Sequence, residues 1–332
     1  MKFGEFPIDE AVGKILAHKL VDADGKKVLG KGIFLTEKHI STLRKQGLST
    51  VIAADIAPED LHEDEGAERI GIALAGEGLR VVAPGSGRAN VISTVRGPLR
   101  VNVPMLEQVN IIAEGITVAT LREHTLVNEG DLVGLVKIIP FGIERARVVD
   151  VEAVTREATA VLSVKPLRSC RATLIISGPG GAKSKLIEAF EEPIRRRIEN
   201  LESTLDCIEM VEHSAPAVAD AIRQHADKDL ILIASISAII DKADVVPTAL
   251  QLAGGSITQF GAPVDPGSLM MLGYLERTPV VGMPGCVQSL KTNIIDWILP
   301  RLIAGEHLTR ADIIVMGHGG LLDDISERPM PR

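Results

Sequence analysis

The residues best suited to chemistry are two aspartates, Asp241 and Asp244, which follow a strongly apolar run at residues 229–234. Mg²⁺ in proteins takes one or two carboxylates and completes its shell with phosphate oxygens and water, so this pair could hold the ion beside a phosphate. An aspartate just before a helix is also a common N-cap, and the spacing alone favours the cap. Both interpretations are kept as predictions.

A second candidate is the turn at residues 282–293, where an apolar segment breaks at Pro284 and Gly285 before a helical pattern. Backbone N–H groups at a helix start point outward, with the positive end of the helix dipole behind them, and such turns bind anions. Ser289 adds a hydroxyl donor. A cysteine at a helix start has a lowered pKa if exposed, so Cys286 could be a nucleophile. Because no histidine is close in sequence, we expect Cys286 to line a ligand site instead.

Other polar or glycine residues stand at the ends of predicted strands or in loops. Ser177 and Gly178 begin a glycine-rich turn, but Ala182 occupies the place where a P-loop needs glycine before its lysine. We therefore do not predict nucleotide hydrolysis by a P-loop, and a plain tight connection remains an equal alternative. The remaining candidate ligand-binding residues are Ser235, Ser237, Asp265, Gly267 and Ser268. We expect His318 to be an exposed loop residue and residues 195–197 to form a solvated helix face.

Strands and helices that alternate along residues 166–332 would position these turns at one edge of a sheet. This alternation predicts a three-layer α/β/α domain with a mostly parallel sheet. The expected strands are residues 172–177, 207–212, 229–234, 279–283 and 312–316. The expected helices are residues 183–203, 215–226, 244–253 and 287–304, with a short one after residue 320. Pro193 should kink or split the first of them.

The N-terminal half is predicted to contain two further domains. Residues 1–58 read as a small α/β unit with a helix after Asp9, a hairpin near residues 23–26 and a helix between Thr36 and Gly47. Residues 59–165 begin with an acidic helix start and continue as a β-rich or α+β domain, with residues 109–112 among its short strand-like runs.

Composition excludes several function classes. The formal net charge of −8 leaves no electrostatic footprint for duplex nucleic acid, and one Trp and one Tyr offer little surface for stacking bases. No apolar run approaches the length of a membrane span. The three cysteines fit no zinc or redox spacing, and the N-terminus is too polar for a secretory signal, so we expect a cytoplasmic protein.

Several segments occur in an order that resembles a known family. They are residues 229–233, Asp244-Val-Val-Pro247, Gly261-Ala-Pro-Val-Asp-Pro-Gly267, Gly282-Met-Pro-Gly-Cys-Val-Gln-Ser289 and residues 297–302. Together they make residues 170–325 resemble the molybdopterin-binding domain of molybdopterin adenylyltransferase and molybdopterin molybdotransferase. The whole chain is most similar to a standalone form of the module that, in some bacteria, precedes a cofactor nucleotidyltransferase domain.

Departures from the family pattern concern its charged and glycine residues. Residues 235–238 replace the family's glycine turn, residues 179–180 replace its Asp-Glu, and Asp265 and Ser268 replace two lysines. Losing two cations beside a phosphate or molybdate disfavours group transfer, because charged donors stabilise developing anionic charge. The sequence therefore favours pterin binding over adenylyl transfer or molybdate insertion.

The resemblance implies that the chain binds molybdopterin, as the molybdenum cofactor or its precursor, in molybdenum-cofactor biosynthesis. In an enzymatic form, Asp241 and Asp244 would be catalytic and would hold Mg²⁺ for nucleotidyl or molybdate transfer. The implied partners are a pterin phosphate, a nucleotide, and a cofactor nucleotidyltransferase or molybdoenzyme, with no nucleic acid and no membrane. A homo-oligomer, dimer or trimer, is expected. The alternatives are a non-catalytic cofactor carrier and an unrelated nucleotide or sugar-phosphate hydrolase.

Overall fold

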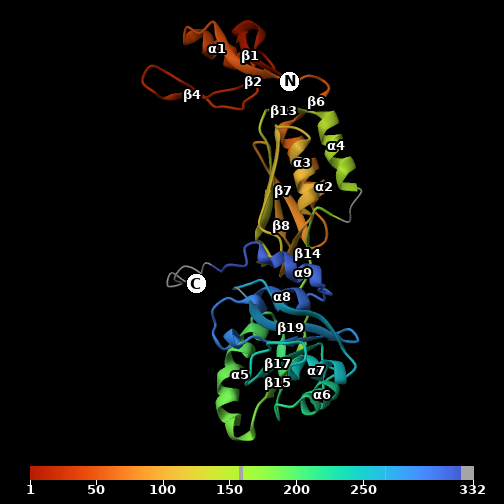
Figure 1. Ribbon diagram of the computed structural model, residues 1–332. Helices are drawn as coiled ribbons and strands as arrows, with labels where there is room; N and C mark the ends of the chain where they lie inside the picture. The colour runs from red at the N-terminus through yellow and green to blue at the C-terminus, as the bar shows by residue number, and fades with distance from the viewer. Residues whose placement is uncertain (157–159, 266, 323–332) are drawn as a thin grey trace. The chain divides into compact units, whose positions relative to one another are not determined.

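The computed structural model describes residues 1–156, 160–265 and 267–322 (Figure 1). The chain divides into two compact units, the first from Met1 to Lys165 and the second beginning at Pro166. Within the described residues, no helix combines the length and the apolar character needed to cross a membrane.

The first part of unit 1 folds around a small apolar core that includes Phe6, Ile40 and Leu43. Its elements are β1 (Lys2–Pro7), η1 (Ile8–Glu10), β2 (Ile15–Leu16), β3 (Leu20–Val21), β4 (Lys27–Leu29), α1 (Glu37–Lys45) and β5 (Thr50–Asp55). The three-stranded antiparallel sheet has the order β1-β5-β2. The hairpin β3–β4 and the cap of α1 by Thr36 agree with the sequence prediction.

The helix predicted after Asp9 is wrong. Residues 8–10 form a single 3₁₀ turn, and the chain then returns as strand β2. Gly13 has a φ of +83°, which no right-handed helix accommodates, and Ile15 pairs with Ala54 of β5. Pairing with a strand distant in sequence therefore overrides the local helical pattern.

The second part of unit 1 has its own apolar core, which includes Leu61, Ile70 and Val136. Its elements are β6 (Asp60–His62), α2 (Glu63–Leu74), β7 (Leu79–Gly85), β8 (Arg88–Ser93), β9 (Gly97–Val101), α3 (Val103–Ile111), β10 (Ile116–Thr120), β11 (Leu126–Val127), β12 (Leu132–Ile138), β13 (Gly142–Glu144), α4 (Arg145–Arg156) and β14 (Leu162–Val164). The sheets are β10-β12-β8-β7, β11-β9-β14 and β13-β6.

This part is α+β, as predicted, and α2 starts with the expected acidic turn. The strand-like run at residues 109–112 is instead the end of helix α3 and its C-cap. Asn102 accepts a hydrogen bond from the Met105 backbone N–H at 3.2 Å, and a proline stands in the first turn. This N-cap and proline start the helix, which then packs its Val109 into the core.

Unit 2 is built on a six-stranded sheet with the order β16-β15-β17-β20-β19-β18. Its elements are β15 (Arg171–Ser177), η2 (Gly180–Ala182), α5 (Lys183–Glu199), β16 (Thr204–Val211), α6 (Ala215–Gln224), β17 (Leu230–Ser235), α7 (Val245–Leu252), β18 (Ser256–Ala262), β19 (Ser268–Leu275), β20 (Thr278–Gly282), η3 (Gly285–Gln288), α8 (Ile294–Ile303), α9 (Arg310–Ile314) and η4 (Val315–Gly317). The pairings among β16, β15, β17 and β20 are parallel, and those of β19 with β20 and β18 are antiparallel.

Helices cover both faces of this sheet, which confirms the predicted α/β class. Helices α6 and α7 pack together on one face around Val218, Ile233 and Leu250, while α5 and α8 contact each other through Arg197 and Asp296 (Figure 1). Strands buried under two helical layers read as continuous apolar runs, as residues 230–234 do.

Several element boundaries in unit 2 differ from the prediction. Strands β18 and β19 were not predicted, and the segment 287–304 divides into η3 and α8. Pro193 lies inside a continuous α5 and does not split it. Of the short helix expected after residue 320, only residues 321 and 322 are described, and they are not helical.

The strand predicted at residues 312–316 is wrong, because this segment forms α9 and η4. Thr309 and Asp312 form a capping box, in which Asp312 Oδ2 accepts hydrogen bonds from the Thr309 N–H at 2.8 Å and hydroxyl at 2.6 Å. Arg301 Nη2 donates to Asp312 Oδ1 at 2.6 Å. The capping box and the buried Arg301 guanidinium therefore select a helix over the strand that the apolar run favours.

The carboxyl group of Asp312 should make stability depend on pH. Its burial would raise the pKa, but hydrogen bonds from Thr309 and Arg301 outweigh burial and lower the pKa from 3.8 to about 2. A group with a lowered pKa in the folded state stabilises the protein above its unfolded pKa, and this contribution is lost as pH falls through the folded pKa. We expect urea unfolding of Asp312→Asn to show a smaller loss of stability than the wild type between pH 3.8 and about 2. If the free energy of unfolding fell equally with pH in the two proteins, this role of Asp312 would be contradicted.

Candidate functional site

The strand order of unit 2 reverses at β15. The chain passes from β15 to β16 on one side and then crosses back to β17 on the other side. Because right-handed crossovers in opposite directions put their helices on opposite faces, the carboxyl ends of β15 and β17 are left uncovered. Ser177 and Ser235, the last residues of these strands, are directly paired, and the Ile236 N–H donates to Ser177 O at 2.9 Å. Two predicted site residues thus meet at the point where open α/β sheets bind ligands.

The turn after β15 combines a buried serine with an exposed glycine-rich connection. Ser177 is fully buried, and its Oγ lies 3.0 Å from His213 Nδ1. Gly178 packs beneath the Leu186 side chain, which leaves no room for a Cβ. Gly180 and Gly181 are exposed and open, and α5 then begins with the exposed Lys183 and no side-chain cap. This turn therefore presents uncapped backbone N–H groups beside a cation.

The turn after β17 is organised by its own side chains. Ser235 Oγ donates to the Ser237 carbonyl, which curls the chain at the strand end. Asp244 is the N-cap of α7: its Oδ1 accepts from Val245 N–H at 2.8 Å and its Oδ2 from Ile240 N–H at 3.1 Å. Asp241 Oδ1 accepts from Ala243 N–H at 2.7 Å. Both aspartates stabilise the local backbone, as the favoured interpretation of the spacing predicted.

This geometry bears on the predicted Mg²⁺ site. Both Asp244 oxygens and Asp241 Oδ1 accept backbone hydrogen bonds, so that among the described residues Asp241 Oδ2 is the oxygen of the pair left for a metal. The described part of the chain contains no cluster of three or more His, Cys, Asp or Glu side chains able to hold a metal. A magnesium ion here would depend on phosphate oxygens and water for its remaining ligands. The catalytic and metal roles of Asp241 and Asp244 stay predictions.

The turn after β20 is an open 3₁₀ segment. Met283 N–H donates to Ile233 O at 2.8 Å, which joins this turn to β17, and residues 285–288 then form η3. A Cβ on Gly285 would meet nothing within 4 Å, so the backbone is accessible there. Cys286 is exposed as a residue, but its thiol is partly buried. This burial raises the thiol pKa more than its backbone hydrogen bond and Arg197 lower it. The expectation of a lowered pKa is therefore wrong, because partial burial of the thiol disfavours the charged thiolate.

A buried arginine anchors this turn to α5. Arg197 is 7% exposed, so its inclusion in a solvated helix face was wrong. Its Nε donates to Asp296 Oδ1 at 2.8 Å, and its Nη1 and Nη2 donate to the carbonyls of Val287 at 3.0 Å and Ser289 at 2.7 Å. Nη2 also donates to Lys291 O at 3.1 Å. The guanidinium therefore fixes the backbone between η3 and α8.

The fourth segment at this edge is the loop between β18 and β19. Because β19 runs antiparallel to β20, its first residue, Ser268, lies at the carboxyl end of β20. Ser268 is buried, with its Oγ donating to Val264 O at 2.8 Å, and Gly267 has a φ of +83°. Asp265 has a φ of +49°, and its N–H donates to Gly320 O at 2.7 Å. Ser268 therefore shapes this loop and does not present its hydroxyl to a ligand.

The sheet thus brings the predicted site residues of all four connections to one edge. Two residues there were missed by sequence reasoning. His213 stands two residues after β16, at the same edge of the sheet, and this position at a strand end was the signal in the sequence. Arg197 lies three residues after Ile194 and seven after Phe190, both buried in α5, so helical periodicity could have predicted its burial.

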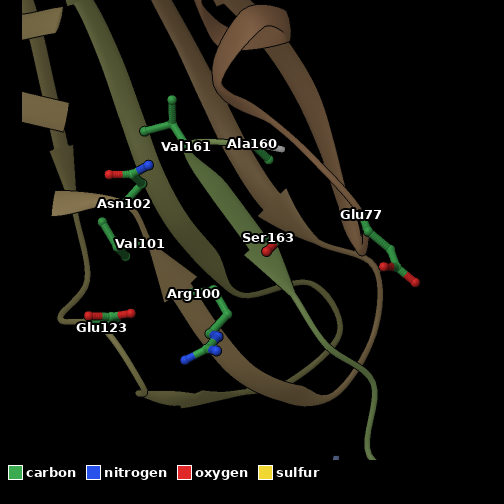
Figure 2. A pocket seen from close by; sticks show the side chains of 8 residues that line it. All are labelled: Glu77, Arg100, Val101, Asn102, Glu123, Ala160, Val161 and Ser163. Atoms are coloured by element: carbon green, nitrogen blue, oxygen red, sulfur yellow. The ribbon is translucent and has the colours of Figure 1, made fainter. Parts of the chain in front are cut away.

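Unit 1 contains a separate polar cavity of about 350 Å³ beside strands β9 and β14 (Figure 2). Arg100 of β9 pairs in register with Ser163 of β14, and both line it. Asn102 caps α3, while Arg100 and Glu123 already have interaction partners. These three polar side chains are therefore engaged within the protein.

Comparisons with known proteins give limited similarities. Residues 5–55 match a family model described as a domain of unknown function (DUF8806). No curated protein matches the chain.

Three solved structures share low identity with the chain. A molybdenum cofactor biosynthesis protein B is 14% identical over 41% of this chain and 94% of its own, with a TM-score of 0.33. The molybdopterin biosynthesis enzyme MoaB from Thermus thermophilus is 16% identical over 41% and 98%, with a TM-score of 0.32. The molybdopterin biosynthesis MoeA protein from Pyrococcus horikoshii is 12% identical over 91% and 75%, with a TM-score of 0.31. Identities and TM-scores this low do not indicate the function of the chain.

Because Arg197 anchors the turn after β20, its replacement should destabilise the protein much more than replacement of the adjacent Arg196. Arg197→Ala leaves Asp296 and several loop carbonyls without their donor, and breaking a buried ion pair costs roughly 3–5 kcal/mol. Arg196→Ala removes only an exposed pair with Glu192, worth up to about 1 kcal/mol. Urea unfolding should separate the two variants, and hydrogen exchange should rise at residues 285–293 in Arg197→Ala alone. Equal effects of the two substitutions would contradict the anchoring role.

Proposed function

We propose that unit 2 binds molybdopterin, as the molybdenum cofactor or its precursor, within molybdenum-cofactor biosynthesis. The observation that supports this most is the convergence of three strand-end turns and the β18–β19 loop at the uncovered switch point. The same connections contain the motifs whose order resembles the molybdopterin-binding domain. An edge that presents exposed glycines and backbone amides suits an anionic ligand in a chain whose net charge is −8.

The two ends of the site differ in chemistry, and this difference orients the proposed ligand. Residues 180–185 supply exposed glycines, uncapped backbone N–H groups and the cations Lys183 and Lys185, which suit a phosphate. Ile236 and Ile240 after β17, together with Leu290 after η3, are exposed apolar side chains. A flat pterin ring would cover these side chains and approach the open backbone at Gly285.

In this proposal, unit 2 binds the cofactor and transfers no group to or from it. Group transfer would need charged donors beside the reacting phosphate, and the β18–β19 loop offers Asp265 and Ser268 where lysines would serve. Asp244 uses both carboxylate oxygens as a helix cap. The bound cofactor would then pass to a partner, either a cofactor nucleotidyltransferase or a molybdoenzyme. A cytoplasmic location and a dimeric or trimeric assembly belong to the same proposal.

A pterin assay with a blocking variant tests this function. Freshly purified protein, with and without added molybdopterin under anaerobic conditions, would be denatured and oxidised with iodine, and the fluorescent oxidised pterin measured. We expect a stoichiometric signal for the wild type and a loss of at least about tenfold for Gly285→Trp, because the indole fills the open turn. Gln251→Trp, on an exposed position at the end of α7, adds the same side chain away from the site and should retain the signal.

Asp244→Ala separates a binder from a transferase. Losing the cap should lower the free energy of unfolding by about 1 kcal/mol, while pterin binding is retained and no nucleotide is consumed by either protein. Nucleotide consumption by the wild type that disappears in Asp244→Ala would support the catalytic alternative. A protein that binds no pterin even when molybdopterin is supplied would sink the binding and carrier functions together.

A further inference from the structure

A cavity of about 630 Å³ lies at the opposite edge of the same sheet. Cys170 and Asp229 stand just before β15 and β17, and Thr278 begins β20, so the cavity opens at the amino ends of these parallel strands. The proposed pterin site uses the carboxyl ends, so the two regions lie at opposite ends of these strands. The volume falls within the range of small-molecule sites, which is roughly 300–1,000 Å³.

Most charged groups that line this cavity are compensated within the protein. Asp229 Oδ2 accepts from the Arg171 N–H at 2.8 Å, and Lys228 Nζ lies 3.3 Å from Asp206 Oδ2. Glu306 Oε2 accepts from the buried Arg301 Nε at 2.8 Å. These groups stabilise the wall and leave little net charge for a ligand.

Two guanidinium groups of the lining are exceptions. In the described part of the chain, neither Arg168 nor Arg277 has a side-chain hydrogen bond or an ion pair, and both line the cavity. Arg168 lies against Gly305, where an added Cβ would stand 2.6 Å from its Nη1. Arg277 occupies the two-residue turn between β19 and β20, next to the exposed Glu276. Arg168 and Arg277 are therefore the guanidinium groups of this lining that are available to pair with an anion.

An aromatic pair forms another wall. The rings of Tyr274 and His307 stack with centroids 4.1 Å apart and an interplanar angle of 27°. Tyr274 is held from below, because its hydroxyl accepts from the Leu308 N–H at 2.8 Å and donates to the Leu308 carbonyl at 3.2 Å. His307 is exposed and lines the cavity, so the pair offers a fixed flat surface to a planar group.

We propose that this cavity binds a small molecule that carries an oxyanion on a planar ring. The carboxylate or phosphate group contacts Arg168 and Arg277, whose planar forks match either anion. The ring packs against the His307–Tyr274 stack. This second site is independent of the pterin site, and its ligand is a different molecule.

Isothermal titration with phenyl phosphate, benzoate and inorganic phosphate tests the proposal on the whole chain. We expect saturable binding of phenyl phosphate or benzoate at millimolar concentrations or below, and weaker binding of inorganic phosphate, which lacks the ring. Whichever of the two ring compounds binds more tightly identifies the anion. Arg168→Gln and Arg277→Gln should each weaken binding at least about tenfold, because a charge-assisted pair is lost. His307→Ala should weaken the ring compounds and leave inorganic phosphate unchanged.

Matched controls locate the binding. Arg196→Gln removes an exposed arginine of α5 that pairs with Glu192, and its affinity should equal that of the wild type. Gly285→Trp blocks the opposite edge and should also leave this binding intact, so failure of the pterin proposal would not affect the result. Thermal unfolding would verify that each variant is folded, and Arg277→Gln on an exposed turn is the variant least able to disturb the core.

Two outcomes would overturn the proposal. One is an absence of saturable binding by either ring compound. The other is binding that survives Arg168→Gln and Arg277→Gln but is lost in Gly285→Trp or Lys183→Gln, which would place the anion at the carboxyl edge instead.

Discussion

The reversal of strand order at β15 is the constraint on which the rest of unit 2 depends. Once the chain has built β16 on one side of β15, the next parallel strand has to cross to the other side, and its helix has to cover the other face. No helix can then cover the carboxyl ends of β15 and β17. The exposed edge is a consequence of chain connectivity, and the serine and glycine turns lie where a ligand can reach the backbone at the carboxyl ends of these central strands.

Holding those turns in place requires interactions that are distant in sequence. Arg197 shows how desolvation is offset by hydrogen bonding. A buried guanidinium loses its hydration, and that free energy is recovered only if all its N–H donors find acceptors. Asp296 neutralises the charge, and the carbonyls of Val287, Ser289 and Lys291 take the remaining donors. The segment after β20 contains one short 3₁₀ helix, η3, and the contacts of Arg197 fix the backbone that follows it. A preorganised backbone of this kind loses little entropy when a ligand binds.

The same carboxylate cannot serve a helix cap and a metal equally well. Asp244 directs both oxygens to backbone N–H groups, and this local use competes with metal coordination because it fixes the orientation of the carboxylate.

Charge is arranged differently at the two edges of the sheet. The carboxyl edge relies on backbone amides and two lysines at the start of α5, whereas the amino edge carries guanidinium groups beside an aromatic stack.

The sequence by itself determined the α/β class, the strands near residues 172–177 and 229–234, and the turns at which Ser177, Ser235 and Gly285 stand. These features are local, since apolar runs, glycines and caps act over a few residues. Only the tertiary structure decided that Arg197 pairs with Asp296 of α8 and that His213 contacts Ser177. It also decided that Arg168 and Arg277 line one cavity. Each of these depends on which segments the strand order places side by side, and pairing between segments far apart in the chain leaves no periodic signal in the sequence.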